Sequence, residues 1–135
     1  MLKHFIIGIP LIVVLALAPL AMGQTMPSGK WWKDPEFIKE LRLTSGDDKK
    51  LDKLFVKYRR RMIDLANRVE KEQFEYQNLM EAPNLDEAAV NRQLQKLEEA
   101  RTELYAEKNR FVVEVRKILG RDRFQKLVQL YSNSQ

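Results

Sequence analysis

The chain has 135 residues, with 24 lysines and arginines against 19 acids and a formal net charge of +5. It has no cysteine, and its one histidine is His4, close to the N-terminus. Disulfide frameworks, thiolate metal sites and histidine-dependent catalytic triads are thereby excluded. We therefore expect neither an enzyme nor a bound cofactor.

Residues 1–23 have the pattern of a signal peptide. Lys3 and His4 precede an apolar run over 5–17, and Ala21 and Gly23 are small residues at −3 and −1 of a cleavage point before Gln24. The alternative is an uncleaved membrane anchor, for which an apolar stretch ending at residue 22 is at the lower length limit. Either way we expect an exported, periplasmic protein, which disfavours nucleic acid as its partner.

Residues 24–33 predict a flexible arm that contains Trp31 and Trp32. The two tryptophans fit a lid over the following helices better than an exposed anchor for a partner. Asp34 before Pro35 then predicts the start of a short helix over 36–41, because Pro is favoured at the first helical position.

Two long helices follow, since residues 47–82 and 84–119 contain no Gly or Pro and are rich in helix-forming residues. Thr44 and Asp47 predict a capping box at the start of the first helix. Asn84 and Glu87 offer a second box after the turn at Pro83. A turn this short requires the helices to lie antiparallel.

The apolar spacing predicts a coiled-coil seam along each long helix. We expect Arg101 to lie near Asp64 or Leu65, and Lys108 near Tyr58. The expected seam of the first helix is Leu51, Phe55, Tyr58, Met62, Leu65, Val69, Glu72, Tyr76 and Leu79. That of the second is Val90, Leu94, Leu97, Arg101, Leu104, Lys108, Phe111, Val115 and Ile118.

Gly120 predicts the end of the second long helix, and Asp122 with Gln125 predicts the cap of a last short helix. The fold class is therefore all-α: an antiparallel helical hairpin over 34–131 with a short helix at each end and a tail at 132–135. One hairpin cannot bury the off-seam residues, so we expect a homodimer; these residues are Val56, Ile63, Phe74, Val112 and Val113.

Charge is polarised along the hairpin, with basic residues over 49–61 and 108–126 at the open end and acids over 70–87 around the turn. For most single charges a solvated surface is the simpler interpretation. The two converging basic segments favour unfolded acidic proteins, anionic lipid head groups or a second subunit as partners. The candidate binding residues are the basic Lys53, Lys57, Arg60, Arg61, Arg110, Arg116 and Lys117 and the apolar Val56, Ile63 and Phe74.

A metal site is disfavoured by the residues available. Met26, Met62 and Met80 are far apart, and carboxylates without His or Cys provide at most weak sites for hard cations.

The layout resembles the periplasmic Spy/CpxP-type proteins and their heavy-metal-sensor relatives, whose hallmark is a repeated Leu-Thr-x-x-Gln. The first copy here is Leu43-Thr44-Ser45-Gly46-Asp47, and the second keeps only Leu119. The run Trp31-Trp32-Lys33-Asp34-Pro35 is similar to the metal-sensor branch.

The resemblance implies one of three functions. The first is an ATP-independent chaperone that holds unfolded envelope proteins on a dimer, which we favour. The second is an adaptor for a sensor kinase or an anti-sigma factor. The third, a metal sensor, is disfavoured because the chain after residue 23 has no histidine.

Overall fold

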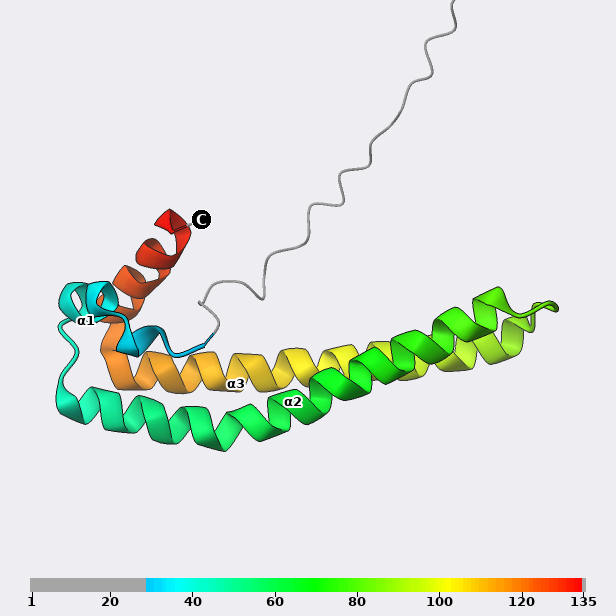
Figure 1. Ribbon diagram of the computed structural model, residues 1–135, viewed down its shortest axis with the longest axis horizontal. Coiled ribbons are helices and arrows are strands. Elements are labelled where there is room, and N and C mark those ends of the chain that lie inside the picture. Colours follow the sequence, from blue (N-terminus) through cyan, green and yellow to red (C-terminus); the bar gives the residue numbers. More distant parts are fainter. Residues whose placement is uncertain (1–28, 135) are drawn as a thin grey trace, which may run out of the picture.

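The computed structural model describes residues 29–134 and is all-helical over that range. A short 3₁₀ helix, η2 (Trp31–Lys33), is followed by α1 (Pro35–Leu41), α2 (Ser45–Glu81) and α3 (Glu87–Asn133). Helices α2 and α3 lie antiparallel and pack along their length (Figure 1). The expected helical hairpin is confirmed, whereas the predicted signal peptide lies outside the described residues.

The first two α-helices begin where their capping residues predict. The Asp34 carboxylate accepts from the Glu36 amide at 2.9 Å at the start of α1. At the start of α2, Thr44 Oγ1 accepts from the Asp47 amide at 3.1 Å, and Asp47 Oδ2 accepts from the Thr44 amide at 2.9 Å. These bonds satisfy amide groups that have no partner inside the helix.

Helix α3 begins later than the sequence suggested. The expected box of Asn84 and Glu87 does not form; instead Asp86 is the N-cap and accepts from the Ala89 amide at 3.1 Å. Asn84 and Asp86 are both good capping residues, and the tertiary course of the turn selects the second.

The seam of α3 differs from the predicted one by one residue at three successive heptads. Gln93, Ala100 and Glu107 are buried where Leu94, Arg101 and Lys108 were expected, and Leu94 is 38% exposed. The small Ala100 lets the helices approach closely, and partners from α2 satisfy both polar residues: Glu72 for Gln93 and Arg61 for Glu107.

The register across the hairpin changes accordingly. Tyr58 packs edge-on against Phe111, with ring centroids 5.8 Å apart; Phe111 lies one turn of α3 beyond Lys108, near which Tyr58 was expected. Arg101 donates to Glu98 Oε1 within α3 and to Gln73 Oε1 of α2, both at 2.8 Å. Gln73 lies about two turns of α2 beyond Asp64 and Leu65, near which Arg101 was expected.

Gly120 bends α3 sharply, because its dihedral angles (φ 78°, ψ 172°) are not helical. The residues after the bend fold back against α1 (Figure 1), and Leu127 is fully buried there. The expected cap by Asp122 and Gln125 is wrong: both lie inside the helical segment that follows Gly120. The helix continues to Asn133, so it includes residues 132 and 133, which were predicted to belong to the C-terminal tail.

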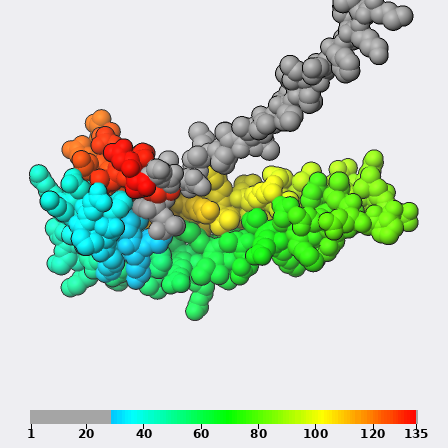
Figure 2. Space-filling model, turned by 45° about the horizontal axis from the view of Figure 1, so that its top comes forward, coloured from blue at the N-terminus to red at the C-terminus, as the bar shows by residue number. Residues whose placement is uncertain are grey.

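The main core lies at the open end of the hairpin, where η2, α1 and the two ends of the hairpin meet. Figure 2 shows α1 and the C-terminal residues gathered at this end, while the turn projects from the other. Trp32 is 1% exposed and packs edge-on against Phe55, so it forms part of a lid as favoured. Residues 31–33 are therefore packed and do not belong to a flexible arm.

Candidate binding surface

Three exposed apolar residues line the outer face of α2. Val56, Ile63 and Phe74 are 72%, 48% and 59% exposed. Their spacings of seven and eleven residues place them on one line along a helix, opposite the face that carries Leu51 and Leu65. We call this line, together with Lys53, Lys57 and Arg60, the α2 outer surface.

An open hollow of about 660 Å³ lies on part of this surface. It brings together four of the predicted binding residues, Val56, Lys57, Arg60 and Ile63, from neighbouring turns of α2. The remaining lining residues are Lys30, Phe55, Arg59 and Asp64. The hollow therefore combines apolar and cationic groups, in a shape too open to enclose a small ligand.

The cations of the α2 outer surface are available to an outside partner. Within residues 29–134, Lys53, Lys57 and Arg60 form no ion pair. Lys57 instead lies over the Tyr58 ring, 5.5 Å from its centroid. An acidic segment that approaches this face would thus meet three cations that form no ion pair in the described chain, with Asp64 as the one acid that lines the hollow.

Arg61 and Arg110 have a different role, because both bind Glu107. Glu107 is only 5% exposed, and its Oε2 lies 3.2 Å from Arg61 Nε and 2.6 Å from Arg110 Nη1. A buried carboxylate needs such neutralisation, and losing one partner would be costly. The distribution of basic residues in the sequence did not indicate that these two arginines neutralise a buried carboxylate between the helices.

The other predicted residues are spread over the molecule. Lys117 pairs with Glu114 at 3.0 Å, whereas Arg116 forms no ion pair within the described part of the chain. Lys53 lies one turn from the hollow, and Phe74 lies three turns beyond Ile63. The structure therefore brings Val56, Lys57, Arg60 and Ile63 together in the hollow and joins Arg61 to Arg110 through Glu107, and it places the other predicted residues apart from both groups.

An ion pair that the sequence did not reveal joins the two ends of the hairpin. Arg123 Nη1 lies 2.7 Å from Asp47 Oδ2, and the same guanidinium donates to the carbonyls of Leu119 and Ile118. The bond from Arg123, with those from Thr44, holds the pKa of the Asp47 carboxyl at about 2, below its ordinary 3.8. The pair thus fixes the Gly120 bend to the start of α2.

A second polar cluster holds η2 against α2. Trp32 Nε1 donates to Asp52 Oδ1 at 2.9 Å, and Lys33 Nζ lies 2.7 Å from Asp48 and 3.0 Å from Asp52. The bond from Trp32 and then that from Lys33 lower the pKa of the Asp52 carboxyl. This cluster places Lys30 at the edge of the hollow.

The comparison with protein families agrees with this architecture. A family described as heavy-metal resistance matches residues 11–126. The chain belongs to the heavy-metal resistance family. Neither the curated proteins nor the solved structures provide a significant match. Membership confirms the resemblance stated from the capping motif and the helical layout.

The family's name raises the question of a metal site, and the described residues do not fit one. No group of three or more His, Cys, Asp or Glu residues between residues 29 and 134 is arranged to hold a metal ion. That range also contains no histidine or cysteine, the usual ligands for zinc and nickel.

Between residues 29 and 134, no helix is long and apolar enough to span a membrane.

Proposed function

We propose that this member of the heavy-metal resistance family is an exported, ATP-independent chaperone that holds unfolded proteins of the cell envelope. The observation that carries the proposal is the α2 outer surface. There, exposed Val56 and Ile63 lie beside Lys57 and Arg60, two cations without an ion pair in the described range. The signal-peptide pattern of residues 1–23 supports export.

The chemistry of this surface suits weak binding of many sequences. Unpaired cations speed the encounter with acidic chains through long-range attraction. Exposed apolar side chains then contribute contact without a shaped pocket, and unfolded chains expose apolar residues of their own. No step requires a nucleotide.

We expect the purified protein to suppress aggregation of a reduced, unfolding client protein near stoichiometric amounts and without ATP. Charge reversal of Lys53, Lys57 and Arg60 to Glu should slow client capture about tenfold at low salt, because it removes the attracting field. Light scattering and stopped-flow fluorescence measure the two effects.

A matched control reverses Arg92, Lys96 and Lys108, three exposed cations of α3 that form no ion pair in the described chain. It changes net charge equally and should leave capture nearly unchanged. Equal slowing by both variants would show that only net charge matters. Aggregation unaffected by a large excess of the protein would contradict the proposal.

An adaptor role is the alternative outcome of the same experiment. Failure to suppress aggregation, together with saturable binding of one folded sensor domain or anti-sigma factor, would favour it. The homodimer expected from the sequence stays a prediction.

A further inference from the structure

We propose that a hollow between α1 and the C-terminal segment of α3 binds a phosphate-bearing anion. We call it the α1 hollow; it has a volume of about 500 Å³ and lies on a different part of the molecule from the α2 outer surface. Its lining residues are Lys39, Glu40, Leu41, Arg42, Asp122, Arg123 and Lys126. The inference does not depend on the proposed chaperone function.

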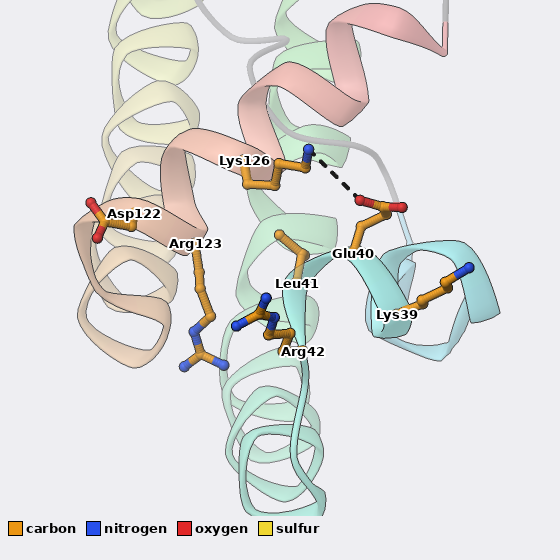
Figure 3. A pocket seen from close by; sticks show the side chains of 7 residues that line it. All are labelled: Lys39, Glu40, Leu41, Arg42, Asp122, Arg123 and Lys126. Atoms are coloured by element: carbon orange, nitrogen blue, oxygen red, sulfur yellow. Dashed lines mark ion pairs between the residues drawn. The ribbon is translucent and has the colours of Figure 1, made fainter.

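The side chains that converge on the α1 hollow are mainly cationic. Figure 3 shows the guanidinium groups of Arg42 and Arg123 reaching toward each other from α1 and α3, with Leu41 between α1 and the C-terminal segment. The carboxylate of Asp122 points away from this meeting place, and so does the ammonium group of Lys39.

Arg42 is the cation that points into the α1 hollow without an acid partner in the described chain; Lys39 is likewise unpaired, but its ammonium group points away (Figure 3). Arg42 is exposed, and its side chain has no ion pair within residues 29–134. Arg123, by contrast, is paired with Asp47 at 2.7 Å, and Lys126 reaches Glu40 only at 3.7 Å. The Asp47 carboxylate is thus held by Arg123, and the guanidinium of Arg42 beside it is left to bind an outside anion.

The backbone of Arg42 has an unusual conformation for an arginine. Arg42 ends α1 in the left-handed conformation, with φ 51° and ψ 47°, where glycine is the favoured residue. Its amide nevertheless closes the helix by donating to the carbonyls of Ile38 and Lys39. A residue other than glycine is strained in this conformation. The same backbone conformation directs the guanidinium group of Arg42 into the α1 hollow.

Phosphate is the ligand class that this arrangement suits. A guanidinium presents a planar pair of donors that matches two phosphate oxygens. The segment after Gly120 also begins here, and the start of a helix carries partial positive charge. The volume of about 500 Å³ admits two linked phosphates beside Arg42.

Calorimetry of the full chain with inorganic pyrophosphate tests the inference. We expect binding at low salt that weakens as salt rises. Arg42→Gly should weaken it about tenfold or more through loss of a charge-assisted bond. The same substitution relieves the positive φ, so its thermal unfolding midpoint should equal or exceed that of the wild type, which excludes misfolding as the cause.

Lys39→Gln is the matched control, because it removes a cation of the same hollow whose head points away from Arg42. It should weaken binding less than twofold. Equal weakening by both variants would overturn the inference in favour of diffuse charge, and so would absence of pyrophosphate binding to the wild type.

The source of the phosphate is distinguished by vesicles. Flotation with phosphatidylglycerol vesicles that requires Arg42 and is blocked by pyrophosphate would identify a lipid head group. Pyrophosphate binding without such flotation would identify a soluble phosphate compound. Either result supports the α1 hollow as an anion site, whereas flotation that is insensitive to Arg42→Gly and to pyrophosphate would contradict it.

Discussion

At the scale of single residues, a few buried or half-buried charges determine how the helices meet. Asp47 completes the capping box of α2 and also binds Arg123, which comes from beyond the Gly120 bend. Glu107 similarly binds Arg61 and Arg110 from inside the hairpin. Each acid joins elements that are distant in sequence, so removing it affects more than one helix.

We expect Asp47→Asn to lower the free energy of unfolding at pH 7 by about 2 kcal/mol, which follows from the lowered pKa of the carboxyl. The folded-state pKa of about 2 is below the ordinary 3.8, so the folded protein holds this proton less tightly. The stabilisation is therefore full above pH 4 and is lost as the pH falls toward 2. Urea unfolding at several pH values measures it.

Asp122→Asn is the control for this experiment, because Asp122 is exposed and lies within the helix after the bend. It should change stability little at any pH. A wild type and an Asp47→Asn variant that lose equal stability between pH 4 and pH 2 would contradict the assigned role of Asp47.

At the scale of elements, the bend in α3 decides where the C-terminal segment packs. A straight α3 would carry Leu127 past the core, whereas the bend at Gly120 returns it to α1. The Gly120 conformation, φ 78° with ψ 172°, is one that essentially only glycine adopts. Backbone freedom at one position thus allows the last turns of the chain to close the core.

Gly120→Ala should therefore destabilise the protein by about 1–3 kcal/mol, the cost of such a strained backbone. A Cβ at this position would meet nothing within 4 Å, so the loss is conformational and not a clash. Gly46→Ala is the control: its Cβ would lie 3.6 Å from Thr44 Oγ1, an ordinary contact inside α2. It should be neutral or slightly stabilising. Urea unfolding compares the two, and a stabilised Gly120→Ala protein would show that the bend is not required.

At the scale of the whole molecule, the two ends of the hairpin differ in character. The open end contains η2, α1, the bend and the main hydrophobic cluster, whereas the turn end extends as two helices alone (Figure 1). The α2 outer surface runs along this framework with its cations free of ion pairs in the described chain. The rigid core at one end thus supports an open surface along the hairpin.

Metal binding is a property of the whole chain, because it requires ligands from several positions. We expect the untagged protein to show no micromolar binding of Zn²⁺ or Ni²⁺ by calorimetry, since its only histidine is His4 and it has no cysteine. A histidine-tagged copy, which binds nickel through the tag, serves as the positive control. Stoichiometric micromolar binding by the untagged chain would contradict the expectation.

The helices and most of their caps could be predicted from the amino-acid sequence, because capping and helix propensity are local. Asp34, Thr44 and Asp47 act as their neighbours predict, and the absence of Gly and Pro over 47–82 is sufficient for α2. The outer position of Val56 and Ile63 likewise follows from their spacing relative to the buried line of the same helix.

The buried side of α3, in contrast, could not be predicted from the sequence and became clear from the packing of α3 against α2. The buried residues Gln93, Ala100 and Glu107 each come directly before one of the expected seam residues, which are Leu94, Arg101 and Lys108. Both sets repeat every seven residues and both contain polar residues, so the periodicity of the sequence cannot show which set is buried. The choice depends on partners from α2, since Glu107 can be buried only where Arg61 reaches it. The pair of Asp47 and Arg123 has the same origin: contacts between distant parts of a chain exist only after the helices have packed.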